Sequence, residues 1–173
     1  GVEPTWFSLG DRDIGTHLVR TQMLNAGYPL SEVTAALCTR WLANDEQLRL
    51  LPMTDDRVET HVTITDPEAP GTRRAVHFQE YWVRLHARPD ALAITLVGLD
   101  DARPAPGVVQ ALQQADLILV APSNPVVSIG PILAVPGLRD GIRAATAPVL
   151  GFAGILGASP VPGMAHRLLP AIG

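Results

Sequence analysis

The residues with the clearest chemical pattern lie at positions 121–131, in the run Ala-Pro-Ser-Asn-Pro-Val-Val-Ser-Ile-Gly-Pro. An apolar run at 117–121 precedes them, so the pattern predicts a strand, a polar turn and the start of a helix. Unpaired N–H groups at that helix start, with the hydroxyls of Ser123 and Ser128, could hold an anion such as a phosphate. The alternative is that Ser123 and Asn124 only cap the helix, and the spacing does not decide between the two interpretations.

A second pattern is formed by carboxylates near turns. Asp11 and Asp13 flank Arg12 before a helix, and Asp55 and Asp56 follow an apolar run at 50–53. Carboxylates on a loop can bind a hard cation or act as a general base for a hydroxyl. For any one of them, a helix cap or a solvated turn is the better-supported interpretation. The functional hypothesis depends on their joint occurrence with other polar residues at element ends, namely Arg12, His17, Gln79 and Glu80.

The composition excludes several other chemistries. All 13 basic residues are arginines, so lysine Schiff bases and the P-loop lysine are ruled out. The five histidines are too scattered for a zinc signature, and no GxSxG elbow is present. A net charge of -4 argues against nucleic acid as a partner. Because the apolar runs are too short to cross a bilayer and Cys38 is the one cysteine, we expect a cytoplasmic protein.

The first half of the chain predicts a helical hairpin followed by a β-hairpin. Apolar residues at helical spacing fill positions 9–42, with Gly27 ending the first helix and Ser31 offering an N-cap for the second. The β-branched and aromatic runs at 58–65 and 75–84 predict the two strands, joined by a turn at 66–72 that contains proline and glycine.

The second half alternates apolar runs with helical segments. Strands are expected at 91–98, 117–121 and 148–153, and helices at 106–115, 128–134 and 138–145. Such a β-α-β-α-β order predicts a parallel sheet with right-handed crossovers. Ligands of such sheets bind beyond the carboxyl ends of the strands, which points to the turns after Gly98, Ala121 and Ala153. The glycine-rich segment at 151–159 would let a ligand approach the backbone closely.

Four segments, in this order, resemble the 2-phospho-L-lactate transferase family of coenzyme F-420 (deazaflavin) biosynthesis. They are Leu-Gly-Asp-Arg-Asp-Ile-Gly-Thr-His at 9–17, Leu-Leu-Pro-Met-Thr-Asp-Asp at 50–56, Phe-Gln-Glu-Tyr at 78–81, and Ala-Pro-Ser-Asn-Pro-Val-Val-Ser-Ile at 121–129. The resemblance extends over essentially the whole chain. It implies an α/β fold with a Rossmann-like parallel sheet and flanking helices, to which the helical hairpin and the β-hairpin are insertions.

The resemblance also implies an activity. Members of the family transfer a phospholactyl or phosphoenolpyruvyl group from its guanosine diphosphate conjugate to the ribityl hydroxyl of the deazaflavin precursor Fo. GMP is released, and Mg²⁺ is required. The arginine-only basicity and the high alanine and proline content favour the phosphoenolpyruvyl donor. Such enzymes are often oligomeric, so a homodimer is one form to expect.

Residue roles follow from the matched motifs. The expected catalytic residues are Asp11, Asp13 and Asp55. The expected substrate-binding residues are Arg12, His17, Asp56, Gln79 and Glu80. The expected nucleotide-binding residues are Ser123, Asn124, Ser128, Gly130, Gly154 and Gly157.

The chain departs from the family pattern at its start. Family members begin with a strand, a glycine-rich turn and acidic residues, and nothing of this kind precedes Gly1. We therefore expect a single α/β domain at 1–173 that is a fragment, with the main magnesium ligands upstream of Gly1. Two other hypotheses stay open, a nucleotide-sugar-binding regulatory protein of the same fold without transferase activity, and an assembly domain whose polar loops are only caps.

Overall fold

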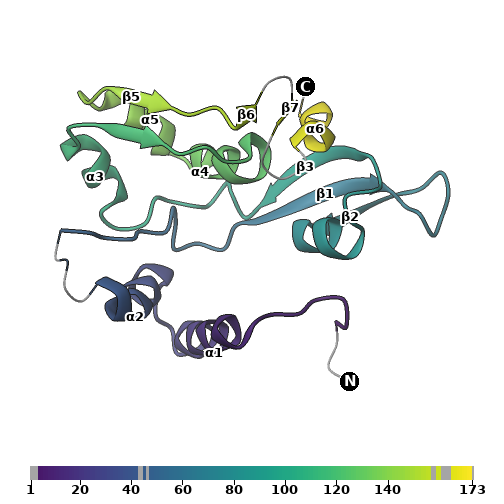
Figure 1. Ribbon diagram of the computed structural model, residues 1–173, viewed down its shortest axis with the longest axis horizontal. Helices are drawn as coiled ribbons and strands as arrows, with labels where there is room; N and C mark the ends of the chain where they lie inside the picture. Colours follow the sequence, from purple (N-terminus) through teal and green to yellow (C-terminus); the bar gives the residue numbers. More distant parts are fainter. Residues whose placement is uncertain (1–3, 43–44, 46, 157–158, 161–164, 173) are drawn as a thin grey trace.

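The computed structural model describes residues 4–42, 45, 47–156, 159–160 and 165–172. It consists of a helical hairpin, an antiparallel sheet and a parallel strand pair with its helices (Figure 1). The hairpin lies on one side, and the two sheets lie side by side above it in the view of Figure 1. In the part of the chain that the structure describes, no helix is both long and apolar enough to cross a membrane.

The helical hairpin is formed by α1 (Asp11–Asn25) and α2 (Leu30–Leu42), as the sequence predicts. The first helix ends in a Schellman motif. The N–H of Gly27 donates to the Leu24 carbonyl at 3.0 Å, and the N–H of Tyr28 donates to the Met23 carbonyl at 3.1 Å. Gly27 adopts a φ of 90°, which a side chain would disfavour, so the prediction that it ends the helix is confirmed.

The second helix begins differently from the prediction. The expectation that Ser31 is its N-cap is wrong, because α2 starts at Leu30 and Ser31 lies in the first turn. The backbone N–H and the hydroxyl of Ser31 donate to the two carboxylate oxygens of Asp55, at 2.6 and 2.8 Å. A remote carboxylate therefore stabilises this helix end and ties the hairpin to the segment that leads into the sheet.

The antiparallel sheet has the strand order β2-β1-β3, with β1 at Glu59–Thr65, β2 at Arg73–His77 and β3 at Ala91–Val97. The β-hairpin prediction is confirmed, with His61 opposite His77 and Thr65 opposite Arg73. The second strand is shorter than the expected 75–84, because the chain turns into a π-helical segment, η1 (Glu80–Arg84), after His77.

The placement of β3 corrects one topological prediction. The segment at 91–98 was expected to join the parallel sheet, but it pairs antiparallel with β1, from Glu59 opposite Val97 to Ile64 opposite Ala91. The apolar character of β3 is equally suited to a half-buried antiparallel strand. An apolar run alone therefore does not identify its partner strand.

The parallel sheet consists of β4 (Ile118–Val120) and β5 (Val149–Gly151), with Ile118 opposite Val149. Between them the chain forms η2 (Pro125–Ile129), α4 (Gly130–Ala134) and α5 (Leu138–Ala144), and α3 (Val108–Gln114) precedes β4. The predicted helices at 106–115, 128–134 and 138–145 are confirmed within a few residues. Helices α3 and α5 pack closely, since a Cβ on Gly141 would lie 3.5 Å from Leu112 Cδ1.

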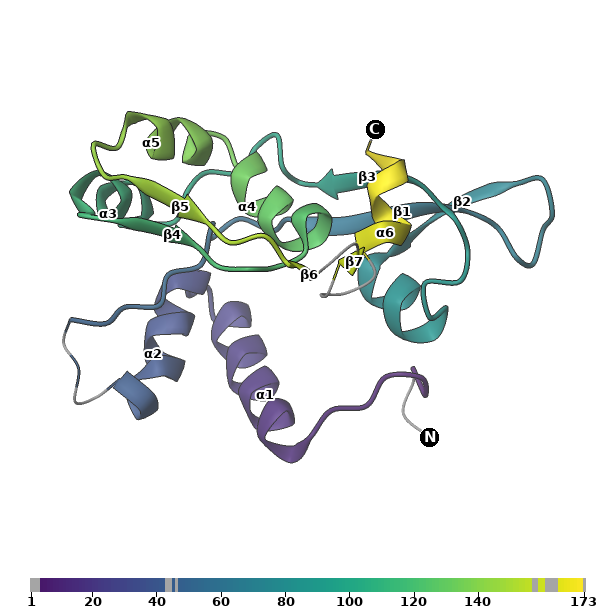
Figure 2. The same ribbon diagram turned by 45° about the horizontal axis from the view of Figure 1, so that its top comes forward.

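The remaining elements complete the core. A short antiparallel pair, β6 (Ile155–Leu156) and β7 (Ser159–Pro160), leads to α6 (Ala165–Leu168) and η3 (Leu169–Ala171). Figure 2 shows α6 crossing over the antiparallel sheet. Buried residues of the sheet, η1, η2 and α6 form one cluster, which includes Val62, Ile64, Val76, Tyr81, Val126 and Leu168. This core joins the antiparallel sheet to the loop that follows β4.

Gly98, directly after β3, lies against the backbone of Arg57. Its φ is 85°, and a Cβ at this position would clash with the carbonyl oxygen of Arg57. Gly27 has a similar φ of 90° but open space around it. We predict that Gly98→Ala lowers the free energy of unfolding clearly more than Gly27→Ala, which should cost about 1–2 kcal/mol for the left-handed backbone alone.

Urea denaturation of both variants would measure this difference. Equal losses in Gly98→Ala and Gly27→Ala would contradict the close approach of Gly98 to Arg57.

Candidate functional site

The candidate site lies beyond the carboxyl ends of β4 and β5. A cavity of about 420 Å³ opens there, at the place that the strand-helix alternation predicts. Its walls come from the ends of both strands, from the start of η2 and from the last helices. The lining residues are Val120, Ala121, Ser123, Pro125, Ile129, Gly151, Phe152, Ala153, Gly154, Ala165 and Leu169.

The two strand ends are held together past the regular ladder. The N–H of Phe152 donates to the Val120 carbonyl at 3.0 Å, one step beyond the pairing of Val120 with Gly151. This bond brings Phe152 to the cavity wall, where its side chain is 56% exposed. A large exposed aromatic ring beside a cavity offers a surface on which a flat ring could stack.

Asn124 shapes the loop on the other side of the cavity. Its side-chain oxygen Oδ1 accepts the N–H groups of Val126 at 2.9 Å and Val127 at 3.3 Å. Its carbonyl oxygen accepts the N–H groups of Ser128 at 3.1 Å and Ile129 at 3.0 Å. Asn124 is 5% exposed, so this buried residue holds four backbone donors in place, two through its side-chain amide and two through its backbone carbonyl.

These hydrogen bonds of Asn124 decide between the two interpretations of this loop that the sequence left open, phosphate binding and helix capping. The interpretation that the N–H groups at the start of η2 are free to bind a phosphate is wrong, because Asn124 accepts them. The alternative, that Asn124 caps the helical segment, is confirmed. Ser123 is half-buried and lines the cavity, so its hydroxyl is the polar side-chain group that this loop presents there.

Gly130 has a packing role in the same loop. It follows η2, and a Cβ at this position would lie 2.8 Å from the carbonyl oxygen of Pro125. The N–H of Gly130 donates to that carbonyl. The π-helical turn therefore requires glycine at this position, and π-helical turns are frequent at functional sites.

The six expected nucleotide-binding residues thus differ in their position relative to the cavity. Ser123 and Gly154 line the cavity, while Asn124 and Gly130 support the loop behind it. Ser128 is half-buried within η2. Gly157 lies outside the described residues. Their predicted contacts with a nucleotide stay predictions.

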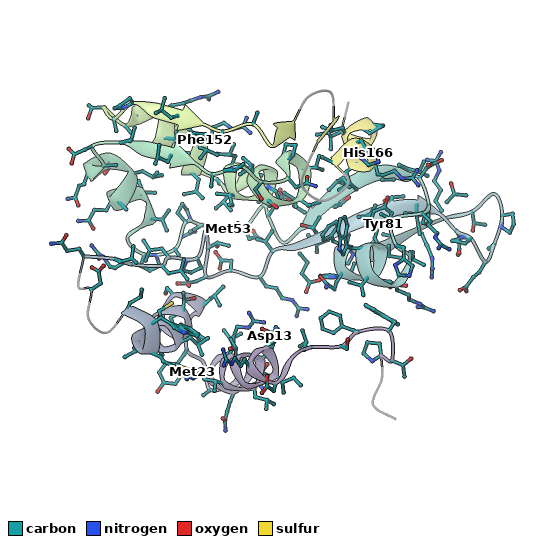
Figure 3. All side chains as sticks on the ribbon, viewed as in Figure 1. Asp13, Met23, Met53, Tyr81, Phe152 and His166 are labelled. Carbon is teal, nitrogen blue, oxygen red and sulfur yellow. The ribbon has the colours of Figure 1, made fainter. Side chains whose placement is uncertain are left out.

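The expected catalytic carboxylates lie elsewhere. Asp11 and Asp13 are exposed in the first turn of α1, whereas Asp55 binds Ser31 near the other end of the hairpin. Since α1 has 15 residues, about 22 Å of helix lies between these two regions. Figure 3 shows Asp13 well away from Phe152, which marks the cavity. The structure does not bring Asp11 and Asp13 together with Asp55 or with the cavity.

The expected substrate-binding residues also have local partners. Asp56 Oδ2 accepts the N–H of Arg103 at 2.8 Å, and Glu80 forms an ion pair with Arg84 at 3.2 Å. The N–H of Gln79 donates to Nδ1 of His77 at 3.1 Å. The remaining two residues lie on α1, where His17 Nδ1 contacts the guanidinium of Arg20 and Arg12 lines a separate cavity.

One carboxyl group outside the expected set, that of Glu59, has a lowered pKa. The guanidinium of Arg57 and, to a lesser extent, the ring of His61 hydrogen-bond to Glu59 and lower the pKa of its carboxyl. His61 also contacts the ring of His77, with 5.6 Å between the ring centroids. Sequence reasoning missed this group, although Arg57 and His61 lie two residues on either side of Glu59, the spacing that puts side chains on one face of a strand.

The described residues contain no ready-made metal site. Among them, no three side chains of His, Cys, Asp and Glu come together in a group that could hold a metal ion. The two best-placed carboxylates are already engaged, Asp55 by Ser31 and Asp56 by Arg103 and Thr54. These residues do not by themselves form a magnesium site.

The strand order, the crossover helices and a cavity beyond the strand ends define a Rossmann-like α/β protein. The family model described as 2-phospho-L-lactate transferase CofD matches residues 5–173. The chain therefore belongs to the 2-phospho-L-lactate transferase CofD family. The resemblance noted from the four sequence motifs is confirmed.

Individual relatives agree with this family. The chain is 65% identical to a phosphoenolpyruvate transferase of Kitasatospora aureofaciens, over all of this chain and 52% of that protein. It is 60% identical to a phosphoenolpyruvate transferase of Streptomyces coelicolor, again over all of this chain and 52% of that protein. The chain thus spans about half the length of the curated relatives that it matches.

A solved structure supports the fold. A crystal structure of a UPF0052 family member from Bacillus halodurans aligns with a TM-score of 0.59 and 20% identity, over 90% of this chain and 47% of that one. The α/β fold class expected from the sequence is confirmed.

The hydrogen bonds of Asn124 can be tested against the neighbouring serine. We predict that Asn124→Ala lowers the free energy of unfolding by about 1–3 kcal/mol, because buried N–H groups lose their acceptor. Ser123→Ala should change it by less than about 0.5 kcal/mol, since Ser123 lies at the cavity wall. Thermal or urea denaturation measures both, and an Asn124→Ala variant as stable as Ser123→Ala would refute the capping role.

Proposed function

We propose that the complete protein is a phosphoenolpyruvate transferase of coenzyme F-420 biosynthesis. The observation that supports it most directly is the identity of 55–65% to curated proteins of that name. The family model supports the coarser class, a transferase of phospholactate type. The relatives' name also favours phosphoenolpyruvyl over phospholactyl as the transferred group.

The proposed reaction is a group transfer at phosphorus. The ribityl hydroxyl oxygen of Fo attacks the phosphorus that carries the enolpyruvyl group of the guanosine diphosphate conjugate. The bond from that phosphorus to the bridging oxygen breaks, GMP leaves, and the hydroxyl proton is lost. Such a transfer needs mainly alignment of the two reactants and neutralisation of charge. The Mg²⁺ requirement, the cytoplasmic location and a homodimer are further parts of this proposal for the complete protein.

The cavity beyond β4 and β5 is the part of this chain best suited to the guanosine end of the donor. Its volume of about 420 Å³ falls in the range of small-molecule sites. Its walls are apolar around Phe152, Pro125 and Ile129, which suits a flat ring, and the Ser123 hydroxyl offers a hydrogen bond. We infer that the ring of the nucleotide occupies this cavity.

Filling the cavity tests this assignment. We predict that Ala153→Leu, which places a larger side chain at the cavity wall, weakens GDP binding by about tenfold or more, because the ring and the new side chain compete for the same space. Ala144→Leu, on the exposed surface of α5, makes the same change away from the cavity and should leave the affinity unchanged. Isothermal titration of the complete protein with GDP and Mg²⁺ measures both affinities.

Unchanged GDP affinity in a folded Ala153→Leu variant would exclude the cavity as the nucleotide site. Absence of GDP binding in the folded, complete protein would exclude the transferase proposal itself.

The carboxylates of α1 are the proposed groups for the reacting centre. We predict that Asp13→Asn lowers turnover by about tenfold or more, the low end of the cost of losing a base or a charge that orients the reactants. Because Asp13 is exposed at a helix start, the free energy of unfolding should fall by no more than about 1 kcal/mol.

The assay is release of GMP from the donor that depends on Fo, measured with the complete protein. Asp140→Asn, in the first turn of α5, is the matched control and should keep the wild-type rate. A wild-type rate for Asp13→Asn would remove this residue from the reacting centre. Donor binding without any GMP release in the unmodified protein would favour the regulatory, non-catalytic alternative.

A further inference from the structure

The helical hairpin is attached to the rest of the chain with little help from buried side chains. All of α1 is described and none of its residues is buried, and in α2 the buried residue is Val33. Figures 1 and 2 both show the hairpin to one side of the two sheets. Because most of the stability of a helix in a protein comes from packing of its apolar face, this hairpin needs another form of attachment.

The contact between α2 and the segment that follows it is loosely packed. A cavity of about 290 Å³ lies between them, lined by residues of α2, Ser31 among them, and by residues 48–51. Within that segment, Leu48 and Leu50 are more than half exposed. An interface with a cavity and exposed leucines resists local opening poorly, so it cannot by itself fix the orientation of the hairpin.

Asp55 supplies the attachment. Its two carboxylate oxygens accept the backbone N–H and the hydroxyl of Ser31, at 2.6 and 2.8 Å. Hydrogen bonds to a charged acceptor are stronger than those between neutral groups, and the dipole of α2 favours a negative charge at this end of the helix. Both residues are half-buried, where a hydrogen bond is stronger than in open water.

The segment that carries Asp55 is itself fixed. The adjacent Asp56 accepts the N–H of Arg103 at its Oδ2, at 2.8 Å, and the N–H of Ala105 donates to the Met53 carbonyl at 3.1 Å. These bonds join the segment to the part of the chain that leads into α3. Asp55 therefore lies on a rigid support, and the hairpin is held to that support through Ser31.

The position of the Ser31–Asp55 contact gives it leverage over the far end of α1. Ser31 follows the turn between the two helices, whereas Asp13 lies in the first turn of α1. The 15 residues of α1 span about 22 Å, so a rotation of about 5° at the contact would move that first turn by about 2 Å. Displacements of this size can slow a transfer reaction by about a hundredfold, because the reacting groups must meet at about 3 Å.

From these observations we propose that Asp55 is a positioning residue. Through Ser31 it fixes the orientation of the hairpin relative to the sheets, and with it the position of Asp13. This role takes the place of the direct catalytic role that the sequence motif suggested for Asp55. Its effect on turnover rests on the proposed function, whereas the attachment of the hairpin through Asp55 does not.

Hydrogen–deuterium exchange of the complete, ligand-free protein tests the attachment without any turnover. In Asp55→Ala, the amides of α1 and α2 should exchange about tenfold faster or more, because the hairpin opens as a local unit, and those of β1, β2 and β3 should be unchanged. Ser31→Ala removes one of the two bonds and should have a smaller effect in the same helices.

Two matched controls keep the Ser31–Asp55 contact. Thr39→Ala removes an exposed hydroxyl of α2 that donates to the Ala35 carbonyl within the same helix, and Asp140→Ala removes an exposed carboxylate from the first turn of α5. Neither variant should speed exchange in the hairpin. If Asp55→Ala does not fold, the comparison of Ser31→Ala with Thr39→Ala provides the same test.

Turnover then separates positioning from proton transfer. Release of GMP should slow about tenfold in Asp55→Ala, with unchanged affinity for GDP, because the proposed nucleotide cavity lies on another part of the chain. Asp55→Asn keeps an oxygen and an N–H that can bind Ser31 but cannot act as a base, so it should be faster than Asp55→Ala. Ser31→Ala keeps the carboxylate and should still slow turnover, by about threefold.

The proposal is overturned if hairpin exchange in Asp55→Ala is unchanged, if exchange in the sheet rises equally, or if the turnover losses of the three variants do not follow their hairpin exchange. Faster hairpin exchange in Asp55→Ala, in a complete protein that releases no GMP, would support the attachment and reject the proposed transferase function. GMP release with unchanged hairpin exchange would do the reverse.

Discussion

The candidate site depends on the buried amide of Asn124. Four backbone N–H groups at the start of η2 converge on its two oxygens, the side-chain oxygen and the carbonyl. With these donors satisfied, the chain can turn sharply out of β4 and still bury Val126 in the core of the antiparallel sheet. The loop is thereby fixed at both ends, by the core on one side and by the strand pair on the other. The cavity takes its shape from that restraint.

A similar restraint connects the helical hairpin to the rest of the molecule. Asp55 accepts two hydrogen bonds from Ser31, and the adjacent Asp56 accepts the N–H of Arg103. Thr54, 3% exposed, accepts the N–H of Asp56 and is bridged to Pro104. The segment at 54–56 therefore holds the start of α2 and the segment at 103–104 together. Two adjacent carboxylates in a sequence can therefore have a structural role as readily as a catalytic one.

The elements with strong local signals were predictable, and their long-range partners were not. The glycine at 27, the hairpin turn at 66–72 and the crossover helices follow from local backbone preferences, and the structure confirms them. The pairing of β3 with β1 depends on competition among apolar strands that the sequence does not rank. The cavity beyond β4 was predictable from topology. The role of Asn124 was open, because an Asn before a helix can either cap its donors or leave them free.

The composition of the cavity limits what part of a ligand it can receive. Its lining residues include no charged side chain, and the N–H groups of Val126 and Val127 at the start of η2 are already bound by Asn124. A phosphate moved into such a site would lose its hydration without a compensating charge, and that exchange is unfavourable. A flat ring loses little by the same move and gains contact with Phe152 and Pro125.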